Sequence, residues 1–164
     1  MDRIWAPWRM QYIELADKTE GCIFCVFPSQ DKDRENLLLY RGKTAFMMLN
    51  CYPYNPGHLM IAPYKHTSDM CDLSDQELLE VNRLVGSSVR LLTAVMEPHG
   101  FNVGINLGRT AGAGIADHIH WHIVPRWDGD TNFMPVIADT KVIPESLLAT
   151  YDKLKEKMEG IGVD

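Results

Sequence analysis

The chain lacks any long apolar run. No stretch approaches the length of a membrane span, and the first residues, Met1–Pro7, mix charged, aromatic and apolar side chains without the apolar core of a signal peptide. We therefore expect a cytoplasmic protein that has no membrane partner.

An excess of basic charge is also missing, and cysteine is scarce. The net charge of −6 argues against a nucleic-acid partner, because phosphate backbones bind basic surfaces. A small anionic ligand stays compatible, since a few local cations and backbone N–H groups suffice to hold one. Four cysteines in 164 residues are too few for a disulfide scaffold. The Cys22-x-x-Cys25 pair therefore indicates metal or redox chemistry.

The length and the spacing of apolar residues predict one α+β domain over residues 1–164. Neither a repeat nor a low-complexity linker divides the chain, which has an N-terminal arm (1–21) and a C-terminal extension (128–164). Alternating or β-rich runs predict a mainly antiparallel sheet, and helical spacing after the Ser74 capping box predicts one long helix. The expected strands are 36–41, 44–50, 58–63, 101–107 and 118–124; the expected helices are 8–15, 74–97 and 144–158.

Half of the six histidines fall within five consecutive positions, where they alternate with large apolar residues. In a strand, successive side chains point to opposite faces. The histidines should therefore share one face, and the apolar residues should fill the other, toward a core. The histidines are His118, His120 and His122; the apolar residues are Ile119, Trp121 and Ile123.

Three interpretations of this row are open. The histidines are satisfied structural groups, or all three bind one catalytic metal, or one of them is a nucleophile in phosphoryl or nucleotidyl transfer. The surroundings favour the third. The glycine-rich segment 108–114 lets backbone N–H groups approach phosphate closely, and Arg109 and Arg126 flank the row.

The motifs then resemble those of the histidine triad (HIT) nucleotide-binding family, over roughly residues 22–127. The flanking segments look like the microbial branch of diadenosine tetraphosphate phosphorylases and hydrolases, which extends the resemblance over most of the chain. The HIT motifs are segments 118–124, 55–63 and 106–109; the branch-specific segments are 5–9, 21–25, 124–133 and 141–145.

The resemblance implies a HIT-like fold and a nucleotidyl transferase or hydrolase that cleaves dinucleoside polyphosphates at the α-phosphate. A covalent AMP–histidine intermediate is implied, and the flanks favour phosphate over water as the acceptor. A nucleoside phosphoramidase and a non-catalytic nucleotide-binding regulator are alternatives that use the same pocket. Homodimers are common in the family, so a homodimer is expected.

The resemblance also assigns roles at matching positions. His120 is the expected nucleophile, and its Nδ1–H is expected to donate a hydrogen bond to the backbone carbonyl of His118. His122 is expected to contact phosphate and the leaving group. His58 is expected to lie behind the row and support its hydrogen bonding. Asn50 is expected to hold the ribose hydroxyls, and Asn106 and the backbone of Gly112 and Gly114 are expected to contact phosphates. The alternative is that Asn50 and Asn106 only close turns. Ile115 stands where many relatives have Ser or Thr, so that hydroxyl contact is missing here.

Relatives with a Cys-x-x-Cys pair hold structural zinc. The matching ligands are Cys22, Cys25, His66 and His118, a closed Cys₂His₂ set. The alternative is two reduced thiols in a packed turn. A thioredoxin-like redox pair is less favoured, because no βαβ pattern surrounds it.

Overall fold

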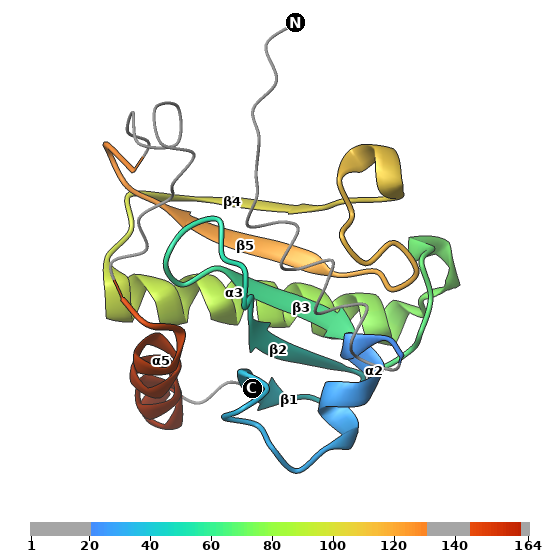
Figure 1. Ribbon diagram of the computed structural model, residues 1–164, viewed down its shortest axis with the longest axis horizontal. Coiled ribbons are helices and arrows are strands. Elements are labelled where there is room, and N and C mark those ends of the chain that lie inside the picture. Colours follow the sequence, from blue (N-terminus) through green and yellow to red (C-terminus); the bar gives the residue numbers. More distant parts are fainter. Residues whose placement is uncertain (1–20, 131–144, 162–164) are drawn as a thin grey trace, which may run out of the picture.

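The computed structural model describes residues 21–130 and 145–161. Three helices are described, together with five strands and three short 3₁₀ turns (Figure 1). The helix expected at 8–15 lies outside the described residues. The helices are α2 (Ile23–Val26), α3 (Asp75–Met96) and α5 (Leu147–Ile161); the strands are β1 (Leu38–Arg41), β2 (Ala45–Leu49), β3 (Leu59–Pro63), β4 (Gly100–Ile105) and β5 (Trp121–Arg126); the 3₁₀ turns are η1 (Phe27–Ser29), η2 (Met70–Asp72) and η3 (Arg109–Ala111).

The strands form one antiparallel sheet in the order β1-β2-β3-β5-β4. This confirms the α+β prediction, although strand ends differ by one to three residues. Residues Ile23–Val26, which include Cys25, form the short helix α2. No helix in the described ranges is long and apolar enough to cross a membrane.

The strand predicted for the histidine row begins later than expected. β5 starts at Trp121, so His118 and His120 lie in the segment before it. Its partner β3 ends at Pro63, which has no N–H to continue the ladder. The N–H of Ile119 instead donates to the carbonyl of Thr67 at 2.7 Å. The side-chain alternation nevertheless continues, because Ile119 packs in the same core cluster as Trp121.

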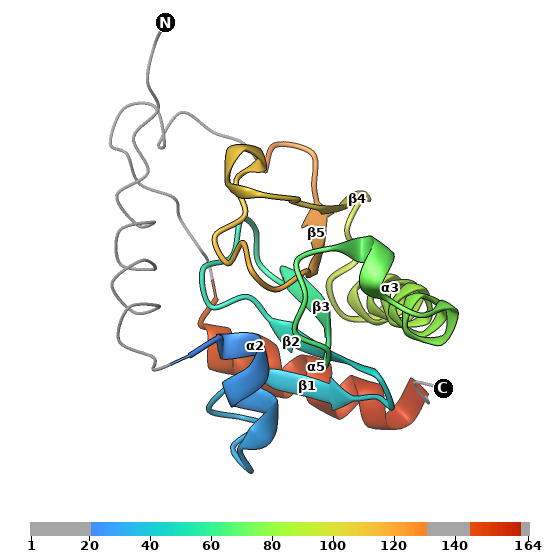
Figure 2. The same cartoon turned by 90° about the vertical axis from the view of Figure 1, so that its right-hand side faces the viewer.

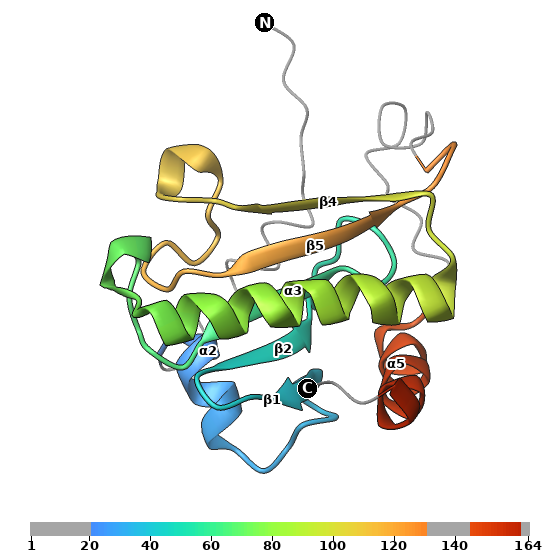
Figure 3. The same ribbon diagram turned by 180° about the vertical axis from the view of Figure 1, so that it is seen from behind.

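Helix α3 runs along one face of the sheet, where it contacts β2, β3 and β5 (Figure 3). Its start is fixed by the predicted capping box, in which Ser74 and Glu77 satisfy each other's backbone N–H groups. Its buried residues pack against the core cluster that contains Trp121 and Ile123. The histidine row is therefore directed to the sheet face opposite α3.

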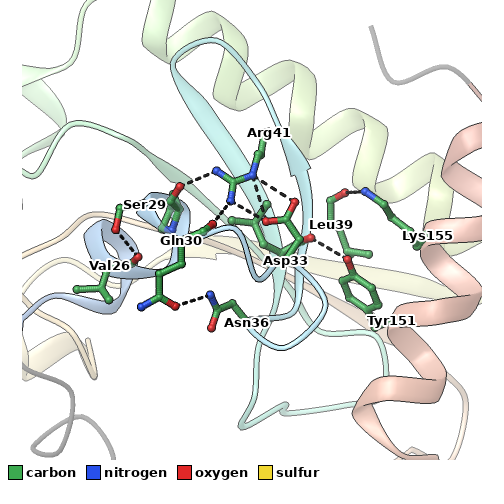
Figure 4. A network of polar contacts seen from close by, with 11 residues as sticks. Val26, Ser29, Gln30, Asp33, Asn36, Leu39, Arg41, Tyr151 and Lys155 are labelled. Carbon is green, nitrogen blue, oxygen red and sulfur yellow. Dashed lines mark hydrogen bonds and ion pairs between the residues drawn. The ribbon is translucent and has the colours of Figure 1, made fainter.

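On that opposite face, α2 covers only the part near β1, β2 and β3 (Figure 2). Phe24 of α2 is 1% exposed and sits in a second apolar cluster with Phe46 and Met60. Arg41 ties the segment after α2 to β1, donating to the carbonyls of Pro28 and Gln30 and to the Asp33 carboxylate (Figure 4). The half of this face over β5 and β4 lacks such a layer among the described residues.

Helix α5 protects the edge strand β1. The Tyr151 hydroxyl donates to the carbonyl of Leu38 at 3.1 Å, and the Lys155 ammonium donates to that of Leu39 at 2.8 Å (Figure 4). These contacts use carbonyl groups of an edge strand that would otherwise be open to pairing.

Candidate functional site

His120 is held in one tautomer. Its Nδ1 lies 2.8 Å from the carbonyl oxygen of His118, and a carbonyl only accepts, so Nδ1 carries the hydrogen. The neutral ring then has its lone pair on Nε2. Burial lowers the pKa of His120, which favours this neutral form.

His122 is held in the opposite tautomer by a chain of hydrogen bonds. The backbone N–H of Tyr54 donates to Nδ1 of His58 at 3.1 Å, so the hydrogen of His58 is on Nε2. That N–H lies 3.0 Å from Nδ1 of His122 and donates to it. The hydrogen of His122 is therefore on Nε2, which is buried and has no hydrogen-bond partner among the described residues. Burial lowers the pKa of His122 to about 4, so the ring is neutral at pH 7.

Asn50 completes the support behind this chain. It follows β2, is 7% exposed, and its Oδ1 accepts from the backbone N–H of Tyr52 at 2.9 Å. This contact orients the amide so that Nδ2 faces Nδ1 of His58 at 3.3 Å. Both polar groups of Asn50 thus have partners within the loop, and its ribose contact stays a prediction.

A second cluster lies at the start of the row. The ligand atoms of Cys22, Cys25, His66 and His118 all lie within 4.8 Å of one another. Nδ1 of His118 is 3.3 Å from Sγ of Cys22 and 3.6 Å from Sγ of Cys25. Nδ1 of His66 is 3.4 Å from Sγ of Cys25 and 3.2 Å from Nδ1 of His118. His118 alone of the three row histidines belongs to this cluster.

These separations fit a tetrahedral metal. Zn–S bonds of about 2.3 Å and Zn–N bonds of about 2.0 Å place the ligand atoms of a regular tetrahedron roughly 3.3–3.8 Å apart. Nε2 of His118 also donates to the carbonyl of Pro63 at 2.9 Å, so its lone pair is on Nδ1, the atom that faces the thiols. The donor set and the tautomer therefore both suit zinc.

A cavity of about 430 Å³ opens beside His122, over the uncovered half of the sheet face. Asn106, at the end of β4, lines it, as the phosphate role expected of this residue requires. Gly112 and Gly114 lie in the loop after η3, and neither lines the cavity; the N–H of Gly112 donates to the carbonyl of Arg109.

Two features of the site escape sequence reasoning. Phe24 packs against the rings of His118 and His120, with ring centroids 5.3 and 4.7 Å away. Its sequence signal is only an apolar residue between two cysteines. Arg126 and Asp130 form a two-point ion pair at the far end of the cavity, with Nε–Oδ2 at 2.5 Å and Nη2–Oδ1 at 2.9 Å. Their spacing of four residues gave no indication of a shared cavity.

Comparison with known proteins agrees with this geometry. The HIT domain family model matches residues 31–129. The AP-4-A phosphorylase of Mycobacterium tuberculosis (strain ATCC 25618 / H37Rv) is 43% identical over 92% of this chain and 80% of its own length. A hypothetical histidine triad nucleotide-binding protein from Sulfolobus tokodaii has a similar structure (TM-score 0.68, 24% identity, 85% of this chain and 93% of that one). So has a Zn-bound histidine triad family protein from Mycobacterium smegmatis (TM-score 0.67, 21% identity, 86% and 95%). The chain belongs to the HIT family.

Proposed function

We propose that the chain cleaves dinucleoside polyphosphates, with diadenosine tetraphosphate as the expected substrate, through AMP bound covalently to His120. The observation that carries this proposal is the pair of opposite tautomers. His120 offers a lone pair on Nε2, and His122 offers a buried N–H that has no partner in the described part of the chain. A nucleophile beside an unsatisfied donor suits attack on a phosphorus whose oxygens accept that hydrogen.

The reaction has two displacements. Nε2 of His120 attacks the α-phosphorus, the P–O bond to the leaving polyphosphate breaks, and its electron pair stays on the departing oxygen. The N–H of His122 stabilises charge on the phosphate or the leaving group. An oxygen of phosphate or water then attacks the same phosphorus and breaks the N–P bond, which gives ADP or AMP. With diadenosine tetraphosphate, the first product is ATP.

The remaining expected contacts enter the proposal with different support. Asn106 lines the cavity beside His122 and is placed to meet phosphate oxygens. Contacts of Gly112 and Gly114 require the substrate to extend toward the loop after η3. Asn50 acts first as a positioning residue, since its amide holds the Nδ1 side of His58. Ile115 packs against the second apolar cluster, and the proposal assigns the contact of the missing hydroxyl to backbone N–H groups of the neighbouring loop.

We also propose that Cys22, Cys25, His66 and His118 hold a structural zinc ion. Four protein ligands leave no open position for substrate. When bound, the ion supplies a tetrahedral crosslink between α2 and the histidine row. His120 and His122 take no part in this set, which separates it from a catalytic metal held by all three row histidines.

The activity is tested by incubating the protein with diadenosine tetraphosphate, with and without phosphate, and separating the nucleotides. ADP plus ATP only with phosphate indicates a phosphorylase, and AMP plus ATP without it a hydrolase. His120→Asn should lower turnover by at least about 10³-fold, because the nucleophile is lost. His99→Asn, at an exposed position, is the matched control. Near-normal turnover by His120→Asn would refute the mechanism. Cleavage of adenosine phosphoramidate alone would favour the phosphoramidase.

A homodimer is proposed on the open edge of β4. Among the described residues, no strand pairs with the outer side of β4, whereas α5 covers β1 at the other edge. Leu107, just beyond β4, is 50% exposed. Sedimentation equilibrium tests the proposal, and a monomer at micromolar concentration would refute it.

A further inference from the structure

The cavity beside His122 extends well beyond the reacting groups. Along β5, His122, Val124 and Arg126 point to the same side and all line it. Four strand residues span about 13 Å, so Arg126 lies far from the phosphorus that His120 attacks. The opposite wall comes from β4, including Asn102 and Val103. A volume of 430 Å³ is within the range of about 300–1,000 Å³ found for small-molecule sites.

The far end of this cavity is held together by hydrogen bonds. Asp130 accepts from Arg126 at two points, and also from the Asn55 amide at 2.8 Å. Nη1 of Arg126 donates to Oδ1 of Asn102 on β4 at 2.7 Å. Three of the five guanidinium N–H groups are therefore engaged at its edges, yet 43% of the Arg126 side chain is exposed. What Arg126 offers a ligand is chiefly its planar face.

The charge of this end selects the kind of ligand. The positive charge of Arg126 is balanced by Asp130, whose side chain is only 9% exposed and whose pKa the ion pair with Arg126 holds well below its usual range. The other described residues of the cavity wall are neutral at pH 7, so no net positive charge is left to attract a terminal phosphate. Amides, apolar side chains and a fixed guanidinium face suit a flat, neutral, polar group.

We propose that this end of the cavity, walled by Arg126, Asp130, Asn102 and Asn55, binds the second nucleoside of the dinucleoside polyphosphate, with its base stacked on the Arg126 guanidinium. The proposal rests on the proposed function, since the phosphate chain must connect this subsite to the phosphorus at His120. It makes Arg126 a specificity-determining residue. The subsite explains how the protein selects a substrate with a nucleoside at both ends of the phosphate chain.

The test compares two ligands with the same phosphate chain. Diadenosine tetraphosphate has the second nucleoside, and adenosine tetraphosphate lacks it. Both affinities are measured by calorimetry on the His120→Asn protein, so that turnover does not interfere. Diadenosine tetraphosphate should bind about tenfold more tightly, at the low end of what base stacking contributes.

Adding Arg126→Lys to the His120→Asn protein keeps the charge opposite Asp130 and removes the planar face, so the affinity ratio should fall to within about twofold. Arg83→Lys, at an exposed position of α3, is the matched control and should keep the tenfold ratio. Equal affinities for the two ligands, or an unchanged ratio in the Arg126→Lys protein, would overturn the subsite. Selective binding without turnover by the unsubstituted protein would refute the proposed function and leave the subsite standing.

Discussion

The two halves of the sheet face opposite α3 are built in contrasting ways. Over β1, β2 and β3, α2 covers the sheet and packs Phe24 into the second apolar cluster. The cluster of Cys22, Cys25, His66 and His118 lies at one end of this half. Over β5 and β4, the described residues leave a cavity lined by both polar and apolar side chains. His120 and His122 lie where the two halves meet, with ring centroids 4.8 Å apart.

The contrast separates rigidity from recognition. The packed half fixes His120 by a ring contact and a backbone carbonyl, which would hold the proposed nucleophile in place before substrate arrives. The open half contains the cavity, amide side chains and the Nε2–H of His122, which has no partner among the described residues. Changes in the packed half should therefore affect stability and activity together, while changes in the open half should affect selectivity and proton binding.

The largest effect should come from breaking the metal cluster. Cys25→Ser removes one of four proposed zinc ligands, and because metal binding contributes directly to folding, we expect a loss of roughly 5 kcal/mol or more in the free energy of unfolding. Zinc content should fall with it, measured by elemental analysis beside urea unfolding. Cys71→Ser, at an exposed position outside the cluster, is the control. Equal zinc content and stability in both variants would show that Cys25 is not a metal ligand and would refute the proposed zinc site.

A smaller effect is expected at the contact between α2 and His120, the proposed nucleophile. Phe24→Leu keeps an apolar side chain but loses the flat ring 4.7 Å from that of His120. We expect a loss of about 2 kcal/mol in stability, and a fall in kcat of about tenfold because His120 gains freedom to rotate. Phe27→Leu, in the same apolar cluster, should lose stability without a comparable loss of kcat. Equal kcat values in the two variants would show that Phe24 only fills space.

The sequence predicts features that follow from the alternation of side-chain directions along a strand and from local helix capping. The alternation around Trp121 and the start of α3 at Ser74 are of this kind, and both are found. The start of β5 is different, since it depends on what Pro63 and Thr67 offer as partners, and these are distant in sequence.

The resemblance to the HIT family brought the four proposed metal ligands together, which spacing alone leaves undecided. The tautomer of His122 depends on His58, whose Nδ1 accepts from the backbone N–H of Tyr54. The type of a residue does not indicate which acceptor its backbone N–H will meet. The orientation of the Arg126 guanidinium depends on its hydrogen bond to Asn102 of the neighbouring strand. Such contacts require the tertiary structure.

The smallest effect should appear in the pH dependence of stability in the open half. His122 has a pKa of about 4 in the folded chain and about 6.5 when unfolded, so below pH 6.5 the unfolded chain binds a proton that the folded chain does not. Stability should therefore fall as the pH drops from 6.5 toward 4. Because His122 is partly exposed, we expect its share to be about 1 kcal/mol at pH 5. The ring faces His58, His120 and Tyr54.

Replacing His122 by Gln removes the titrating ring. Urea unfolding of both proteins at pH 7.5 and pH 5 should give a smaller drop for His122→Gln, because one source of proton uptake on unfolding is gone. His99→Gln, at a half-exposed ring outside the cavity, should retain the full drop. An equal drop in all three proteins would show that His122 is protonated as readily in the folded chain as in the unfolded one. The folded ring would then titrate near pH 6.5, and below that pH selection of a phosphate oxygen at His122 would rest on charge attraction instead of on a neutral donor.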